Sequence, residues 1–427
     1  MSDNKLNLKK DKLQRDWTKQ FLASPTLRHS MIIATGVGKS RFAMLVMEAL
    51  ENDFDEFRIL VDNTRLRDFN WKEDFIKWGK EELFKKVQLF TYQAAYRWNP
   101  KELDLSKVFI LGDEVDFVIG TPEYGKFFTN FPKVKMLGVT GYVAKNKRAA
   151  LHKVLPILVD YPHEQAVAEG VINDMKFIFV KYELDKDPKG IHVKYKKNGA
   201  PAEFYQSENA AYDYATTAFN KAYAAYQIGL NQKLLFMMNS NEFSILEKRM
   251  HATRNKRKNL LYSGIASKRI AKQVIDSILV ESDKSKVVVF SKFTKQVSAI
   301  CKHTYHNKNT TKINDSNYDA FNAGDIRVLG ICDKINRGVN MIGLNNLVIE
   351  SCSSSDTVVR QRVGRAGRLD VKEIAYIYIL IPYYMKKVGN QYEQAQTQMA
   401  TWVKKMLEGY DLSKAEVIDK RIVKEIK

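Results

Sequence analysis

Three short segments of this sequence carry residue types suited to phosphate chemistry. The first is ATGVGKS, residues 34–40, in which two glycines precede a lysine and a serine. Glycines let backbone N–H groups approach phosphate oxygens, a lysine ammonium can meet their charge, and a serine hydroxyl can ligate Mg²⁺. Ile33 stands where the general phosphate-loop pattern has its first glycine. The segment therefore predicts a phosphate-binding loop, and its alternative is an ordinary glycine turn.

The second segment is acidic. Asp113-Glu114-Val115-Asp116 directly follows the apolar run VFILG. Acids at the carboxyl end of a parallel strand point into a ligand crevice. Asp113 could hold Mg²⁺ through water while Glu114 polarises an attacking water, as hydrolysis of a phosphoanhydride requires. The alternative is a solvated loop, which the preceding phosphate loop disfavours.

The third segment, QRVGRAGR at residues 361–368, is basic and interrupted by glycines. Arginine stays charged and binds phosphate oxygens through two N–H groups, so Arg365 and Arg368 suit the stabilisation of transition-state charge. The alternative is a basic surface patch.

Alternating apolar runs and amphipathic stretches indicate the elements that position these segments. In the first third, short β-branched runs such as RILV, VFILG and VKMLGVT alternate with helical patterns, which is typical of a parallel α/β sheet. After about Met175, IHVKYKK and APAEFYQ around Asn198-Gly199 predict a β-hairpin, followed by a helical region. The α/β alternation returns from about Gly264, and the chain from Asn390 onward predicts a helix with a charged tail.

Composition limits the classes of partner. Of 427 residues, 69 are Lys or Arg and 49 are Asp or Glu, which gives a net charge of +20. This excess favours a polyanionic partner, the alternative being that it only maintains solubility. A hydrophobic share of 45% excludes wholesale disorder.

Cysteine usage and hydropathy favour a cytoplasmic protein. Three cysteines without a CxxC pair indicate neither a disulfide framework nor a zinc site, and they fit a reducing compartment. The amino-terminal residues lack the apolar region of a secretory signal. The longest apolar run, residues 374–385, is too short to span a bilayer and reads as a buried strand.

Together these segments resemble the superfamily 2 helicases and nucleic-acid translocases, in which two RecA-like lobes bind ATP in the cleft between them. ATGVGKS resembles motif I, DEVD the DExD box and QRVGRAGR motif VI. The other motifs are matched, in family order, by LVDNTRLRDFNWKEDFIKW (Ia), LFTYQAAYR (Ib), LGVTGY (III), VVVFSKF (IV) and CDKINRGVN (V).

The resemblance implies roles for single residues. Asp113 and Ser40 would support Mg²⁺, Glu114 would be the catalytic acid/base, and Asp116 and Thr140 would couple ATP state to lobe contacts. ATP would be bound by Thr35, Gly36, Val37, Gly38, Lys39, Ser40, Gly338 and Asn340. From the second lobe, Gln361 would reach the nucleotide together with the arginine fingers Arg365 and Arg368. The residues at the positions where the family contacts the nucleic-acid backbone are Thr64, Arg65, Thr91, Tyr92, Ser291 and Cys332.

The sequence departs from the family pattern in places. Thr140-Gly141-Tyr142 replaces the Ser/Thr-Ala-Thr of motif III, and Cys332 replaces a threonine. Thr18 stands where the family has its adenine-reading glutamine, which leaves Gln14 or Gln20 as substitutes.

The implied fold is α/β, with two RecA-like parallel-sheet lobes in tandem. We expect lobe 1 at residues 1–175, a hairpin and helical insert at 176–255, lobe 2 at 256–385 and a helical extension at 386–427. Two candidates for separating strands stay open: the hairpin at 194–205, whose alternative is structural packing, and the basic segment at 248–258, whose alternative is a solvated helix face.

Motif VI begins with Gln361, and this residue, the motif Ia pattern and AEGVIND resemble the DNA-acting branch near restriction-enzyme motors and phage branch-migration helicases. The expected function is an ATP-dependent DNA helicase or translocase acting on single-stranded, forked or branched DNA. The alternatives are an RNA-acting helicase and a non-motor binding protein with a vestigial nucleotide site. The compact plan resembles virus-encoded repair or recombination helicases, which act in the host cytoplasm.

Overall fold

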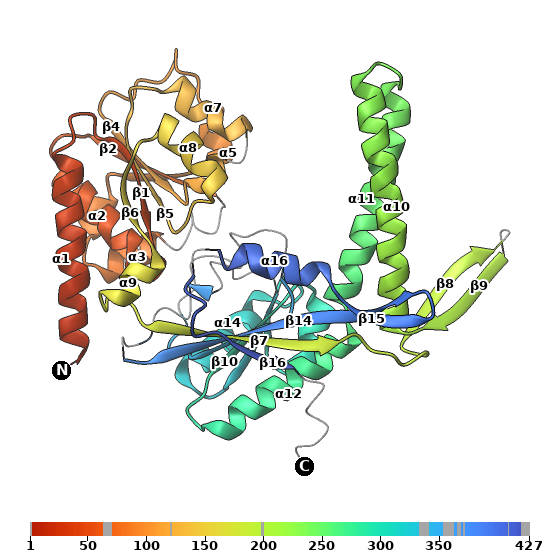
Figure 1. Ribbon diagram of the computed structural model, residues 1–427. Helices are drawn as coiled ribbons and strands as arrows, with labels where there is room; N and C mark the ends of the chain where they lie inside the picture. The colour runs from red at the N-terminus through yellow and green to blue at the C-terminus, as the bar shows by residue number, and fades with distance from the viewer. Residues whose placement is uncertain are drawn as a thin grey trace.

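The structure is a computed structural model, and it describes the chain except for residues 1, 63–70, 120–121, 198–199, 333–340, 353–362, 365–368, 370–371, 409 and 420–427. Two sheets form two lobes, the first sheet parallel and the second parallel except where β14 (Ile374–Val388) pairs with β15 (Gln391–Gln396), and a pair of long helices projects from the second lobe (Figure 1).

The sheet of the first lobe is entirely parallel. Its strands are β1 (Arg28–Ile33), β2 (Glu56–Val61), β3 (Val87–Thr91), β4 (Val108–Asp113), β5 (Lys135–Thr140) and β6 (Ile157–Tyr161). They lie in the order β3-β2-β4-β5-β1-β6. β1 therefore neighbours β5, which in turn neighbours β4. The apolar strand sequences suit this arrangement because helices cover both faces.

Helices pack on both faces of this sheet around two separate cores. They are α1 (Ser2–Leu22), α2 (Lys39–Ala49), α3 (Trp71–Lys77), α4 (Glu81–Phe84), α5 (Tyr92–Ala95), α6 (Asp116–Ile119), α7 (Pro122–Asn130), α8 (Lys145–Val154) and α9 (His163–Ala168). Phe21 of α1 and Phe42 of α2 belong to one core, and Tyr92 and Phe127 belong to the other.

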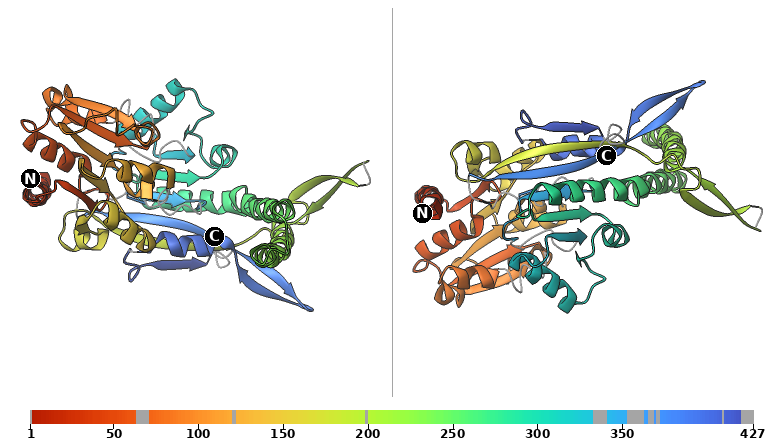
Figure 2. Two further views of the ribbon diagram at one scale, coloured as in Figure 1. Left: turned by 90° about the horizontal axis from the view of Figure 1, so that it is seen from above. Right: turned by 90° about the horizontal axis from the view of Figure 1, so that it is seen from below.

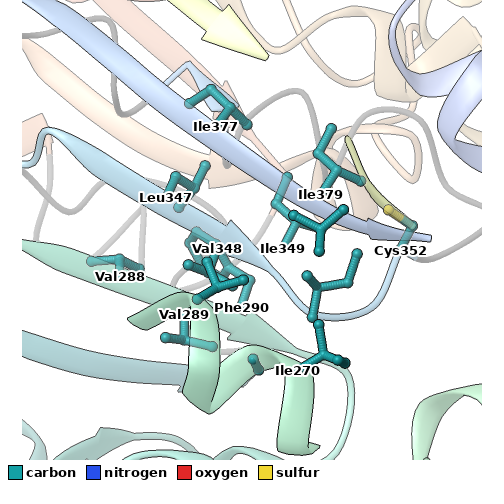
Figure 3. Packing of buried hydrophobic residues seen from close by; sticks show 14 of the residues in the cluster. Ile270, Val288, Val289, Phe290, Leu347, Val348, Ile349, Cys352, Ile377 and Ile379 are labelled. Carbon is teal, nitrogen blue, oxygen red and sulfur yellow. The ribbon is translucent and has the colours of Figure 1, made fainter. Parts of the chain in front are cut away.

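The second sheet has the order β11-β12-β10-β13-β14-β7-β16, with β15 paired to β14. Its strands are β7 (Asp174–Glu183), β10 (Val287–Ser291), β11 (Thr304–Tyr305), β12 (Val328–Cys332), β13 (Asn346–Ile349), β14 (Ile374–Val388), β15 (Gln391–Gln396) and β16 (Glu416–Asp419). The accompanying helices are α12 (Ile265–Glu281), α13 (Thr294–Ile300), α14 (Thr311–Ala323) and α16 (Gln398–Met406). Val289 of β10, Val348 of β13 and Ile377 of β14 lie in its buried core, with Ile270 of α12 packed over them (Figure 3).

Between β7 and α12 the chain forms two projections. β8 (Ile191–Lys197) pairs with β9 (Ala200–Gln206) as an antiparallel hairpin, and α10 (Glu208–Leu234) packs along α11 (Ser240–Tyr262). We call the α10–α11 pair, residues 208–262, the arm. The β8–β9 hairpin and the β14–β15 hairpin leave the second lobe on the same side as the base of the arm (Figure 2).

The expected architecture of two parallel α/β lobes is confirmed, and so is the predicted hairpin. Lobe 1 ends close to the expected residue 175, but the insert expected at 176–255 begins too early, because β7 pairs with β14 and β16 inside the second sheet. Its run KFIFVKY alternates in burial and has a strand on each side, so it is a sheet strand of lobe 2 and no part of an insert.

The expected helical extension at 386–427 is also wrong over much of its length. β14 continues to Val388, turns at Gly389-Asn390 and returns as β15, while β16 joins the edge of the second sheet. Gly389 has a φ of 61°, the left-handed conformation that a two-residue hairpin loop requires. Of the predicted helix, α16 remains.

Within the part of the chain that the structure describes, no helix is both long and apolar enough to cross a membrane.

Candidate active site

The predicted chemical groups of lobe 1 meet where three neighbouring strands end. The phosphate loop follows β1, Thr140 ends β5, and Asp113 ends β4. Since these strands are parallel and adjacent in the order β4-β5-β1, their carboxyl ends share one edge of the sheet.

The phosphate loop has the backbone that phosphate binding requires. Gly36 and Gly38 have φ angles of 95° and 99°, which side-chain-bearing residues rarely adopt. Gly38 precedes the first turn of α2, where Lys39 and Ser40 lie. Unpaired N–H groups and the helix dipole make such a terminus attractive to anions. The residues present therefore fit the phosphates of ATP.

Glu114 lies between a cation and a hydroxyl. Its Oε1 is 3.6 Å from Lys39 Nζ, and both side chains are mostly buried, at 16% and 13% exposed. The Thr140 hydroxyl lies 3.3 Å from Glu114 Oε2 and 2.6 Å from Asp116 Oδ1. The three strand ends are thus joined through their side chains, with Thr140 in the middle.

The backbone at Glu114 is held in an unusual conformation. Its φ is 51°, in the left-handed region that costs a non-glycine residue about 1 kcal/mol or more. Its flanks are fixed because Val115 N donates to Val139 O at 3.2 Å and Phe117 N donates to Glu114 O at 3.0 Å. Such strain persists where the surroundings impose it, and here it directs a carboxylate toward Lys39.

The departure from the family at Gly141 has a local explanation. A Cβ at this position would lie 3.0 Å from Thr35 Oγ1 and 3.1 Å from Lys39 Nζ. Glycine therefore leaves room for the lysine beside motif III, room that the alanine of the family pattern would restrict.

Side chains of helix α1 hydrogen-bond to the backbone of the phosphate loop, a feature that the sequence patterns did not reveal. Gln14 Nε2 donates to Val37 O at 2.8 Å and to Gly38 O at 3.3 Å, and Arg41 Nη1 donates to Gln14 Oε1 at 2.9 Å. Lys10 Nζ donates to Gly36 O at 3.1 Å. Gln14 is buried, so its amide serves the loop backbone, whereas Gln20 is exposed. Both Gln14 and Gln20 stay candidates for the residue that recognises adenine.

These hydrogen bonds give a test at Gln14. Gln14→Ala removes two hydrogen bonds to the loop and also removes the oxygen that accepts from Arg41 Nη1. ATP affinity should therefore fall about tenfold, or ~1.4 kcal/mol. Titration of a fluorescent ATP analogue measures it. Lys19→Ala, at an exposed position of the same helix, is the control. Equal affinity for the Gln14 variant and the wild type would show that the loop holds its shape alone.

Two residues expected to contact nucleic acid, Thr91 and Tyr92, make structural contacts at the end of β3. The Thr91 hydroxyl caps α5 by accepting from Ala94 N at 3.3 Å. Tyr92 is buried, and its hydroxyl donates to Asp113 O at 2.9 Å. Burial, together with Asp113 and Asp116, raises the pKa of Tyr92 well above its usual value. Tyr92 therefore supports the acidic strand end from within the core.

The expected contacts in lobe 2 are buried as well. Ser291 is fully buried at the end of β10, and Cys332 at the end of β12 directs its thiol to Lys292 O at 3.1 Å. Burial argues against nucleic-acid contacts by the side chains of Tyr92, Ser291 and Cys332, because each lies beneath the surface.

Several predicted site residues lie outside the described residues and stay predictions: Thr64, Arg65, Gly338, Asn340, Gln361, Arg365 and Arg368. Within motif VI, however, Gly364 is described. A Cβ on Gly364 would lie 2.6 Å from Thr35 Cβ. The second lobe therefore touches the phosphate loop directly. Shortly after Gly364 in the chain, Leu369 N donates to Asn173 Oδ1 at 3.2 Å.

The described residues contain no group of three or more His, Cys, Asp or Glu side chains that could enclose a metal ion. At a phosphate site Mg²⁺ takes one or two protein ligands besides phosphate and water. Ser40 and Asp113 would be those ligands.

Comparisons with known proteins agree with this geometry. Residues 270–370 match the family model of the helicase conserved C-terminal domain. The Hef helicase domain of Pyrococcus furiosus has a TM-score of 0.51 at 14% identity, over 86% of this chain and 94% of that one. This chain has the fold of a superfamily 2 helicase.

Two further structures share the helicase fold. The type ISP restriction-modification enzyme LlaBIII bound to DNA has a TM-score of 0.59 at 14% identity, over 95% of this chain and 31% of that one. Dbp5 of S. cerevisiae bound to RNA and ADP BeF3 has a TM-score of 0.52 at 11% identity, over 95% of this chain and 89% of that one. A search of curated proteins gave no match. The likeness thus extends to proteins bound to either nucleic acid.

Proposed function

We propose that the protein is an ATP-dependent DNA helicase or translocase, which uses ATP hydrolysis between its two lobes to move on or remodel forked or branched DNA. The observation that carries the proposal is the meeting of Lys39, Glu114 and Thr140 at adjacent strand ends, with Gly364 of the other lobe packed on the same loop.

The arrangement suggests what each group does. The loop N–H groups and Lys39 bind the phosphates, and Mg²⁺ held through Ser40 and Asp113 would neutralise phosphate charge. When Lys39 turns to the phosphates, Glu114 loses its cationic neighbour and can orient and deprotonate water. Thr140 touches Glu114 and also Asp116, the first residue of α6, so it can transmit the change to the rest of the lobe.

One observation favours DNA over RNA. LlaBIII, whose structure includes DNA, has the highest TM-score of the structures described above. The net charge of +20 suits a phosphate backbone bound without sequence preference, which DNA and RNA share. RNA is the second candidate, because the structure of Dbp5, which contains RNA, matches a similar share of this chain. We also propose that the protein acts in the cytoplasm, as its cysteine usage predicts.

The choice of nucleic acid can be tested through ATPase activity. Single-stranded and forked DNA should each stimulate steady-state ATP hydrolysis at least about tenfold, and RNA of the same length should do so weakly. Raising salt from low to physiological ionic strength should steeply reduce DNA affinity, because binding releases counterions from the DNA and added salt opposes that release. Stimulation by RNA alone would overturn the DNA assignment and leave the motor intact.

The role of Glu114 is tested by Glu114→Gln. Turnover should fall at least about 100-fold because the amide cannot accept a proton, while ATP binding persists because Lys39 and the loop are unchanged. Single-turnover hydrolysis and nucleotide titration separate the two. Glu82→Gln, at an exposed position of α4, is the control. Hydrolysis at the wild-type rate in the Glu114 variant would assign the base elsewhere; loss of binding would make Glu114 structural.

A further inference from the structure

The far end of the arm carries an apolar tip that is largely exposed to solvent. We define the tip as Leu234, Leu235, Phe236 and Met237, whose exposed fractions run from 68% to 97%, with Phe236 the highest. The tip lies where the arm is farthest from the second lobe (Figure 1). Apolar side chains placed in water add nothing to folding, so the tip suits a contact made with another molecule.

The backbone at Phe236 strengthens this conclusion. Its φ of 59° places a bulky aromatic residue in the left-handed region, which favours Gly or Asn. The turn itself is fixed by backbone bonds, with Phe236 N donating to Lys233 O at 3.1 Å and Met237 N donating to Gln232 O at 2.8 Å. Folding therefore does not explain a phenylalanine here.

The two helices hold the tip firmly. Gly229 allows their close approach, since a Cβ there would lie 2.5 Å from Leu246 Cδ1. Tyr226 packs on Phe243 with ring centroids 5.3 Å apart. Asn239 and Glu242 form a capping box that begins α11 directly after the turn. At 1.5 Å per residue, α10 alone extends the tip about 40 Å from its base.

The base of the arm is fixed to the second lobe. The buried Glu208 carboxylate accepts from Ile265 N at 3.0 Å and Ala266 N at 3.2 Å, at the start of α12. Asn209 exchanges two hydrogen bonds with the Met385 backbone, at 2.9 and 2.7 Å. At the end of α11, Leu261 and Tyr262 belong to the core of the second lobe. The arm must then move as one body with that lobe.

The stem of the arm pairs cations with aromatic rings. Arg257 lies over Phe219 at 4.1 Å and Lys256 over Tyr214 at 5.7 Å. Tyr214 and Lys256 are exposed. These residues belong to the basic segment 248–258 and the helix that faces it. Cations beside exposed aromatic rings suit a nucleic-acid strand, whose phosphates and bases they can bind together.

We propose that the arm is the strand-separating element of the protein, in which Phe236 stacks on the last base pair of a duplex at a branch. The other tip residues would cover the exposed bases while the stem binds phosphates. Because the arm is fixed to the second lobe, closure of the lobes would move the tip against the branch. The inference rests on the proposed function, and it assigns the basic segment to the stem of the element.

Phe236→Asn tests the proposal without damaging the fold, because asparagine tolerates a positive φ better than phenylalanine does. A forked duplex of the nucleic acid that stimulates the ATPase carries 2-aminopurine in its last base pair. The fluorescence change on binding wild type should fall at least about fivefold in Phe236→Asn and be retained in Phe236→Trp. Separation of the fork should fall in parallel, while ATPase stimulation by single strands stays within about twofold.

Val280→Asn, at an exposed apolar position of α12, is the matched control and should leave the fluorescence unchanged. An equal signal from Phe236→Asn and wild type, with normal ATPase stimulation, would overturn the inference and assign the tip to a protein partner. Absence of ATPase stimulation by any nucleic acid in the wild type would instead overturn the proposed function.

Discussion

The active site depends on one constraint of the first sheet, which is that β5 lies between β1 and β4. Parallel strands bring their carboxyl ends to one edge, so Lys39 and Glu114 can meet only across the strand between them. That strand ends in Thr140, which touches Glu114 and Asp116 of the DEVD segment, and the chain continues to Gly141, which leaves room for Lys39. A different strand order would separate the cation from the carboxylate, and a side chain at Gly141 would crowd Thr35 and Lys39.

A second constraint ties the lobes together through the chain itself. β7 leaves the first lobe and runs between β14 and β16 of the second sheet. Asn173, directly before β7, accepts from Leu369 N, and Gly364 packs on Thr35. The phosphate loop, the strand that connects the lobes and motif VI therefore converge. A change in the loop on nucleotide binding has a direct route to the second lobe and to the arm that Glu208 fixes on it.

The sequence predicted what short-range patterns encode. Gly36, Gly38, Lys39 and the DEVD segment are contiguous signals, and Asn198-Gly199 marked a hairpin locally. The position of β7 could not be read in this way, because its neighbours β14 and β16 lie about two hundred residues later in the chain. The strand β15 was missed although Gly389-Asn390 signals a turn, since its polar sequence QYEQAQ resembles an exposed helix. Burial of Tyr92 and Cys332, and the hydrogen bonds of Gln14 to the loop, arise from long-range packing that no motif records.

The central claim is that nucleotide binding moves the second lobe and its arm together against the first lobe. Distances between spin labels test it, because the native cysteines 301, 332 and 352 are all buried and labels would go to introduced ones. Labels at Ile245→Cys on the arm, Val280→Cys on lobe 2 and Ile76→Cys on lobe 1 occupy exposed positions. On adding a non-hydrolysable ATP analogue, the Ile245–Val280 distance should stay constant while the Ile245–Ile76 distance changes. A change between arm and lobe 2, or no change in either pair, would contradict the account.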